Sequence, residues 1–161
     1  MGWSYQTTLL EDWITAFYRN LGIWKPSDLC IDKIAHQCNI ILLKETVESY
    51  YITNDYMQMI VIDSRLCKEK QREVFFHELC HVLRHAGMQG MMPPAFRELQ
   101  EWDAVHFTKY AAIPAHMLQY IRLEKDTIVA DMSEMFGVTP ELCKKRLAHI
   151  HNKIQMREHS A

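Results

Sequence analysis

The feature that most constrains this chain is a pair of histidines four residues apart, in the stretch "REVFFHELCHVLRHAG" at residues 72–87. Residues at this spacing share one face of an α-helix, with Cβ atoms about 5–6 Å apart, so His77 and His81 can bind the same metal ion. Glu78 follows the first histidine, where its carboxylate can reach a water molecule at the metal and take its proton. The motif HExxH therefore predicts a zinc peptidase site.

The surroundings of the motif matter, because chance alone can produce it. Random shuffling of a chain with this composition gives HExxH about 0.04 times. The apolar residues of the stretch recur at helical spacing and fall on the side opposite the two histidines. They are Phe75, Phe76, Leu79, Val82, Leu83 and Ala86. The predicted helix thus has one face for a core and one for a cleft; the alternative is a surface helix that happens to be rich in histidine.

His85 does not fit the same ion. It lies eight residues after His77, about 12 Å along the helix axis, which is too far for both to bind one metal. We expect it to support the site or to contact substrate. The longer metzincin motif is excluded, because it requires Gly at position 84 and His at position 87, where this chain has Arg84 and Gly87.

A catalytic zinc ion binds three protein ligands, so a third donor must come from elsewhere. Glu101 is the candidate, on a helix predicted from Phe96 to Ala112. Its side of that helix carries short side chains that let another helix come close. They are Ala104, Val105, Thr108 and Ala112. The larger apolar residues, predicted to face a core, are Phe96, Leu99, Phe107 and Tyr110. Glu98 and His106 are alternative ligands. Glu98 and Glu101 could also lie on an ordinary solvated helix face.

Around these helices the sequence predicts an α+β fold, mostly helical with one small sheet. Runs rich in Ile, Val and Tyr at residues 39–45, 48–53 and 56–63 predict three strands. Asn54-Asp55 between the last two suits a tight hairpin, so we expect a mainly antiparallel sheet. Helices are predicted over residues 8–20 and 27–38, the second with Ser27 as its N-cap.

The C-terminal residues 126–153 predict a helix pair joined at Gly137, with Thr139 capping the second helix and Pro140 in its first turn. This pair resembles a helix-turn-helix (HTH). We therefore predict a domain over residues 1–122 and a packed C-terminal extension over 123–161. The basic residues of the second helix raise the possibility of a DNA-binding regulator. They are Lys144, Lys145, Arg146 and Lys153, and nearby acids dilute their charge, which argues against direct DNA binding.

Composition excludes several classes of function. The formal net charge of −2 and the pI near 6.5 give no general attraction to nucleic acid or anionic membranes. The sequence has no apolar run of about 18 residues and no signal peptide, which predicts a cytoplasmic protein without a membrane span. Five cysteines, never closer than eight residues apart, form neither a disulfide framework nor a CxxC pair. Free thiols in a reducing compartment are expected.

Three segments together resemble the ImmA/IrrE family of metallopeptidases: "MIVIDSRL", "QREVFFHELCHVLRH" and "EWDAVHFTKYAAIP". In that family a strand and a short loop lead into HELGHxxxH, and a following helix carries a segment like ExxANxFAxxLLMP. The matching positions of that helix are Glu101, Ala104, Phe107 and Pro114. Among the departures are Cys80 for Gly, Val105 for Asn or Asp, Thr108 for Ala and Ile113 for Met. None of them removes a predicted ligand or the predicted base.

The resemblance implies a zincin-like domain with one zinc ion held by His77, His81 and Glu101, and with Glu78 as the catalytic base. Family members of phages and conjugative elements cleave HTH repressors, which implies a cytoplasmic antirepressor peptidase with a repressor as substrate. The alternatives are a non-proteolytic, zinc-containing repressor-binding protein and an HTH DNA-binding regulator. Two further expectations are open: His85 or His106 as a second donor to the substrate oxygen, and residues 87–92 as a connector or a pocket wall.

Overall fold

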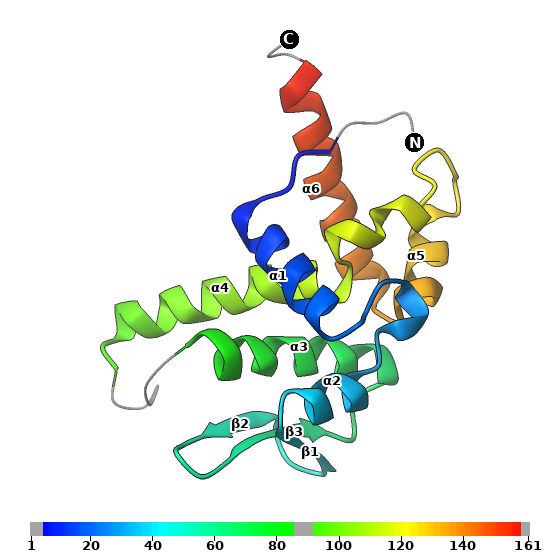
Figure 1. The fold of residues 1–161 in the computed structure, drawn as a ribbon. Coiled ribbons are helices and arrows are strands. Elements are labelled where there is room, and N and C mark those ends of the chain that lie inside the picture. The colour runs from blue at the N-terminus through cyan, green and yellow to red at the C-terminus, as the bar shows by residue number, and fades with distance from the viewer. Residues whose placement is uncertain (1–4, 86–91, 159–161) are drawn as a thin grey trace. The chain divides into compact units, whose positions relative to one another are not determined.

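The computed structural model describes residues 5–85 and 92–158 (Figure 1). Most of the methionine-rich segment, residues 87–91, lies outside the described residues. The chain divides into two compact units, which we call the terminal unit (Met1–Leu29 with Lys109–Ala161) and the central unit (Cys30–Thr108). The boundary predicted between residues 122 and 123 stays a prediction.

The sheet belongs to the central unit. It consists of β1 (Ile40–Glu45), β2 (Tyr50–Thr53) and β3 (Gln58–Asp63), in the order β1-β3-β2. The Asn54 side chain accepts hydrogen bonds from the backbone N–H groups of Tyr56 and Met57, both at 2.9 Å, and so closes the predicted antiparallel hairpin of β2 and β3. β3 is the central strand, and it pairs with β1 in parallel. The α+β class is confirmed, and the sheet is mixed rather than mainly antiparallel.

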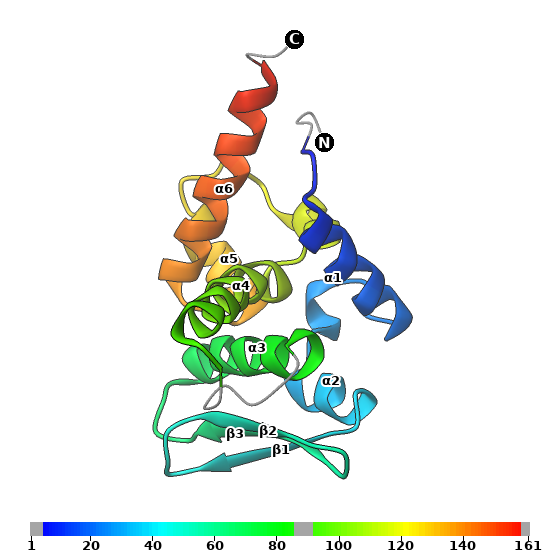
Figure 2. The same ribbon diagram turned by 90° about the vertical axis from the view of Figure 1, so that its left-hand side faces the viewer.

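Helices cover one face of this sheet. α3 (Lys68–Arg84) lies along β3 and β2, and α2 (Ile31–Gln37) lies beside β1 (Figures 1 and 2). The interface consists of fully buried side chains from β3 and α3. They are Ile60, Ile62, Phe75, Phe76 and Leu79. The apolar side predicted for the motif helix is therefore the side that forms the core, and the two histidines lie outside that side.

α4 (Pro94–Ala112) packs differently from the prediction. Phe107 is buried, as expected, but Phe96 and Leu99 are 63% and 62% exposed, so the prediction that they face a core is wrong. Ala104 is buried and occupies the side of the helix that faces the interior. At 100° per residue, Leu99 and Val105 fall outside that sector, and Val105 is exposed as well. The small residues, rather than the large ones, make the packing side of this part of α4.

The terminal unit contains α1 (Leu9–Asn20), η1 (Pro26–Asp28), η3 (Ala115–Tyr120), α5 (Ile128–Phe136) and α6 (Pro140–Glu158). Thr8 and Glu11 form a capping box at the start of α1. Gly22 follows the helix with φ +70°, a left-handed conformation that glycine adopts without a Cβ penalty. Among the described helices none is apolar over enough residues to cross a bilayer.

The helix predicted from Ser27 begins later. Residues 26–28 form the single turn η1, and α2 starts at Ile31 with Cys30 as its N-cap. The prediction of a Ser27 cap is wrong because Asp28 stabilises a separate turn before α2. Its carboxylate accepts hydrogen bonds from the backbone N–H groups of Trp24 and Lys25 and closes a separate turn there.

The junction of the C-terminal helix pair lies at the predicted residues, whereas the pair extends to Glu158 rather than to residue 153. Gly137 ends α5 in the left-handed conformation, and the Thr139 hydroxyl accepts a hydrogen bond from the Leu142 N–H at 3.3 Å. Arg146, one of the basic residues counted for DNA binding, is completely buried. It forms an ion pair with Glu11 at 2.6 Å. Its positive charge is therefore compensated within the terminal unit and is not exposed to DNA.

Candidate metal centre

Two helices of the central unit bring three predicted ligands together. α3 carries His77 and His81 one turn apart, and α4 carries Glu101. The Nε2 atoms of the two histidines are 3.3 Å apart. The Glu101 carboxylate places Oε2 at 3.1 Å from His77 Nε2 and Oε1 at 3.2 Å from His81 Nε2. All three donors converge on one point.

The spacing of these donors fits a zinc ion. A tetrahedral ion with bonds of about 2.0–2.1 Å places neighbouring nitrogen and oxygen donors about 3.3–3.4 Å apart, close to the observed 3.1–3.3 Å. Burial lowers the pKa of His81 to about 4, and the nearby His77 and His85 add to the effect against the charge of Glu101. His81 is therefore neutral at pH 7, the form in which imidazole binds metals.

Glu78 lies next to this cluster along α3. Burial raises the pKa of its carboxyl group to about 7, and the negative charge of Glu101 adds to the effect. A carboxyl group with a pKa near neutrality exchanges a proton readily at physiological pH. Its position and its acidity both suit a general base.

The two alternative third ligands lie elsewhere. Glu98 is exposed on α4 and is not part of the cluster of His77, His81 and Glu101. His106 donates a hydrogen bond from Nδ1 to the Trp102 carbonyl oxygen at 2.9 Å, and its ring lies 4.0 Å from the Trp102 ring. Among the described residues, the geometry favours Glu101 over both.

A second row of side chains lies against His81. His85 Nδ1 is 2.9 Å from His81 Nδ1, and His85 Nε2 is 3.0 Å from Asp103 Oδ2. Sequence reasoning had placed His85 outside the ion's reach but had not singled out Asp103. Asp103 lies two residues after Glu101, about 200° around the helix, so an argument based on one helix face could not include both.

Tyr51 of β2 is a further residue that the sequence did not indicate. Its ring stacks on the His81 ring, with centroids 5.0 Å apart and planes 8° from parallel. Burial raises the pKa of its hydroxyl, and the charges of Glu78 and Glu101 raise it further. The hydroxyl is therefore protonated at neutral pH and available as a hydrogen-bond donor. Only the packing of β2 against α3 brings it to the cluster.

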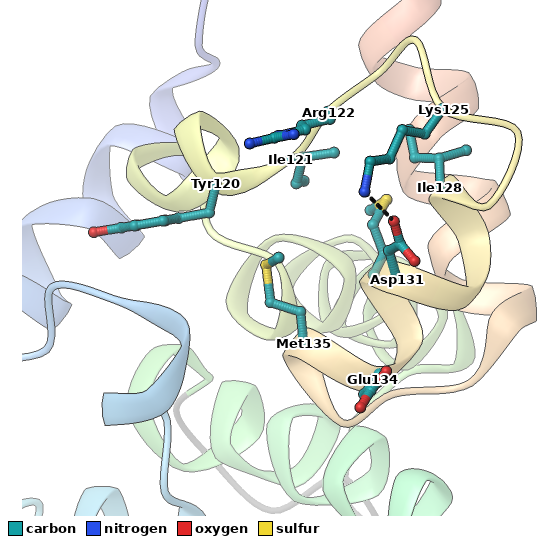
Figure 3. Close-up of a pocket in the computed structure, with 9 residues that line it drawn as sticks. Tyr120, Ile121, Arg122, Lys125, Ile128, Asp131, Glu134 and Met135 are labelled. Atoms are coloured by element: carbon teal, nitrogen blue, oxygen red, sulfur yellow. Dashed lines mark hydrogen bonds and ion pairs between the residues drawn. The ribbon is translucent and has the colours of Figure 1, made fainter.

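The terminal unit contains an open pocket of about 460 Å³ that includes none of these residues. It lies between the end of η3 and α5, where Lys125 and Asp131 form an ion pair at 3.4 Å (Figure 3). Ile121, Ile128 and Met132 supply apolar surface. Its two cations, Arg122 and Lys125, are balanced by the acids Asp131 and Glu134, so the pocket offers no concentrated charge for a ligand.

Comparison with known proteins decides the family. Residues 35–148 match the family described as Peptidase_M78, IrrE N-terminal-like domain. The chain belongs to this family. It is 37% identical to the phage-like element PBSX protein XkdA of Bacillus subtilis over 140 residues, covering 86% of this chain and 71% of that protein. It is 31% identical to the uncharacterized protein YqaB of the same organism over 152 residues, covering 93% and 88%.

Family membership confirms the predicted resemblance and establishes a domain of the metallopeptidase type. The matched range contains β1 to β3, α3 and α4, and therefore every residue of the candidate metal centre. The donor cluster and the family description thus point to the same part of the chain.

Proposed function

We propose that the protein is a zinc-dependent, site-specific endopeptidase that cleaves an HTH-type repressor. The observation that carries the proposal is the convergence of His77, His81 and Glu101, with donor atoms 3.1–3.3 Å apart, beside the half-buried Glu78. This donor set leaves a fourth tetrahedral position for water or substrate, as catalytic zinc sites require.

Zinc at this site would supply Lewis acidity, which polarises a peptide carbonyl and lowers the pKa of water toward about 7. Glu78 accepts the proton of the water that attacks the carbonyl carbon. As the C–O bond forms and the C–N bond breaks, Glu78 returns that proton to the leaving amine. One carboxyl group serves as base and then as acid, which suits a pKa near 7.

We assign Tyr51 the task of donating a hydrogen bond to the carbonyl oxygen as that oxygen gains negative charge. Its hydroxyl is protonated and shares the electrostatic environment of Glu78 and Glu101. The two histidines first considered for this task are engaged elsewhere. His85 contacts His81 and Asp103 through its two nitrogens, and His106 donates to Trp102.

The sheet offers a way to hold an extended substrate. β2 is an edge strand and carries Tyr51, which stacks on His81. A peptide segment can add to such an edge through backbone hydrogen bonds, which places its scissile bond near the cluster. A repressor as substrate is supported by the resemblance to ImmA/IrrE peptidases and by a relative named as a protein of a phage-like element. Cleavage in the cytoplasm would then relieve the repression of the element's genes.

Direct DNA binding has less support. Of the basic residues on α6, Arg146 is buried and Lys145 pairs with Glu141 at 2.8 Å. Both charges are at least partly neutralised within the chain. A DNA-binding surface needs cations that face the phosphates, so the helix pair fits a packing role better than a recognition role.

The decisive experiment incubates the zinc-loaded protein with the HTH repressor encoded beside its gene and follows the products by mass spectrometry. We expect one defined cut with the wild type and a rate about 10²–10⁴-fold lower with Glu78→Ala, because the general base is lost. Glu98→Ala, which changes an exposed acid on α4, is the control and should cleave normally.

An intact repressor with both proteins, recovered as a complex with the zinc-loaded chain, would replace the peptidase by a repressor-binding antirepressor. Equal cleavage by the wild type and Glu78→Ala would remove Glu78 from its assigned role.

A further inference from the structure

His81 contacts a chain of two further side chains through the ring nitrogen that does not face Glu101. His81 Nδ1 lies 2.9 Å from His85 Nδ1, and His85 Nε2 lies 3.0 Å from Asp103 Oδ2. Asp103 also accepts a hydrogen bond from Arg84 Nε at 3.1 Å. His81 is 2% exposed, so these contacts are sheltered from water at the His81 end.

The chemistry of the ring nitrogens allows only one direction for this chain when His81 binds a metal. A neutral imidazole that binds through Nε2 carries its proton on Nδ1. The Nδ1–H of His81 can donate only to an unprotonated Nδ1 of His85. The proton of His85 must then stand on Nε2, where it donates to the Asp103 carboxylate.

We infer that Asp103 and His85 are positioning residues that fix the tautomer and orientation of His81, so that its Nε2 lone pair faces the metal. The inference rests on the zinc site of the proposed function. Metal-binding histidines commonly donate their second N–H to a carboxylate or another acceptor, and losing that partner weakens metal binding. Here the carboxylate acts at one remove, through a second imidazole.

A second metal ion is the competing interpretation, because Cys80 lies beside the same two side chains. Its Sγ is 3.6 Å from Asp103 Oδ2 and 4.0 Å from His85 Nε2. A zinc ion with sulfur at about 2.3 Å and nitrogen at about 2.0–2.1 Å would hold these donors about 3.5–3.6 Å apart, closer than the observed sulfur–nitrogen distance. The Arg84 guanidinium already contacts Asp103 and opposes another cation. The geometry therefore favours one ion and a positioning pair.

The test measures zinc affinity by competition with a chromophoric chelator, independently of peptidase activity. Asp103→Ala should weaken zinc binding about 10–100-fold. Asp103→Asn should weaken it less, since the amide oxygen can still accept the hydrogen bond from His85. Glu98→Ala removes an exposed acid from the same helix and should leave the affinity unchanged. Equal affinities for Asp103→Ala and the wild type, with both folded, would overturn the inference.

A second measurement reads the proton positions directly. Long-range ¹H–¹⁵N NMR of the zinc-loaded wild type should show the His85 proton on Nε2, and Asp103→Ala should lose this preference. A merely structural role for Asp103 would not set the tautomer of His85. A proton on Nδ1 of His85 in the wild type would reverse the direction of the hydrogen bonds from His81 to Asp103 and would refute the proposal.

Zinc stoichiometry separates this inference from the proposed function. Native mass spectrometry should find one ion per chain in the wild type and in Cys80→Ala. Two ions, falling to one in Cys80→Ala, would establish a second metal site and overturn the positioning role. No zinc in the wild type would refute the proposed function itself, whereas zinc lost in Glu101→Ala but unaffected by Asp103→Ala would refute only the positioning pair.

Discussion

Glu11 in the terminal unit and Glu101 in the central unit are both helix glutamates that contact nitrogen atoms of other helices. Glu11 is completely buried and accepts hydrogen bonds from the Tyr5 hydroxyl and the Thr8 N–H beside its ion pair with Arg146. The Glu101 side chain is 49% exposed and faces two imidazoles, of which His81 is held neutral by burial.

The difference lies in how the negative charge is compensated. Arg146 carries a permanent positive charge, so the Glu11 cluster is complete within the protein. Two imidazole nitrogens and a carboxylate that converge can each offer a lone pair to the same point in space, an arrangement that suits a bound cation. One cluster therefore stabilises the fold, and the other is suited to chemistry. The comparison leads to four predictions.

Glu101→Ala should have the largest effect, and only on function. We expect turnover to be lost and zinc affinity to fall by more than about 100-fold, because even the loss of an outer partner costs about 10–100-fold. The free energy of unfolding of the metal-free protein should change little, since the side chain is half exposed. Chelator competition and urea unfolding measure the two quantities. A large loss of stability without any loss of zinc binding would contradict the assignment of Glu101 to metal binding.

Arg146→Met should instead lower the stability of the fold. Removing one partner of a buried ion pair leaves an uncompensated charge, which costs about 3–5 kcal/mol in the free energy of unfolding. Urea denaturation of the metal-free protein measures this cost. The exposed pair of Lys145 and Glu141 supplies the control, because Lys145→Met should cost only about 0–1 kcal/mol. Similar costs for the two variants would show that burial does not distinguish the pairs.

The two tyrosines of the clusters give a matched pair of smaller changes. Tyr51→Phe keeps the ring on His81 but removes the assigned donor, so kcat should fall about 10²–10³-fold with zinc affinity unchanged. Tyr5→Phe removes a hydrogen bond to charged Glu11 and should lower the free energy of unfolding by about 1.5–3 kcal/mol. Steady-state kinetics and urea unfolding of both variants test the assignment; a normal kcat in Tyr51→Phe would exclude its hydroxyl from the reaction.

Acid should weaken the Glu11 cluster by the smallest amount. Burial raises the pKa of Glu11, but the charge of Arg146 and the hydrogen bonds from Tyr5 and Thr8 outweigh it, so the folded pKa lies below the ordinary value of 4.5. This carboxylate contributes stability above pH 4.5 and loses it as the pH falls through its folded pKa. Unfolding of the metal-free wild type at successive pH values should show this loss, and Glu11→Gln should lack that part of it.

Local patterns in the sequence predicted the parts of the fold that depend on neighbours along the chain. The helix over residues 8–20, the Asn54 hairpin and the junction at Gly137 each depend on residues within a few positions, so the backbone conformation follows from them directly. The same holds for His77 and His81, because one turn of helix separates them. Asp28 shows the limit of such reading, since its side chain capped a turn that the pattern had assigned to a helix.

The sequence by itself determined the α+β class, the helix that carries His77, Glu78 and His81, and the family to which the chain belongs. Only the tertiary structure decided the parallel pairing of β1, the burial of Arg146 and the exposure of Phe96 and Leu99. It also brought Asp103 and Tyr51 to the candidate metal centre. The physical reason is that helical and strand periodicity specify which residues share a face, whereas the partner of each face depends on contacts between segments far apart in the chain.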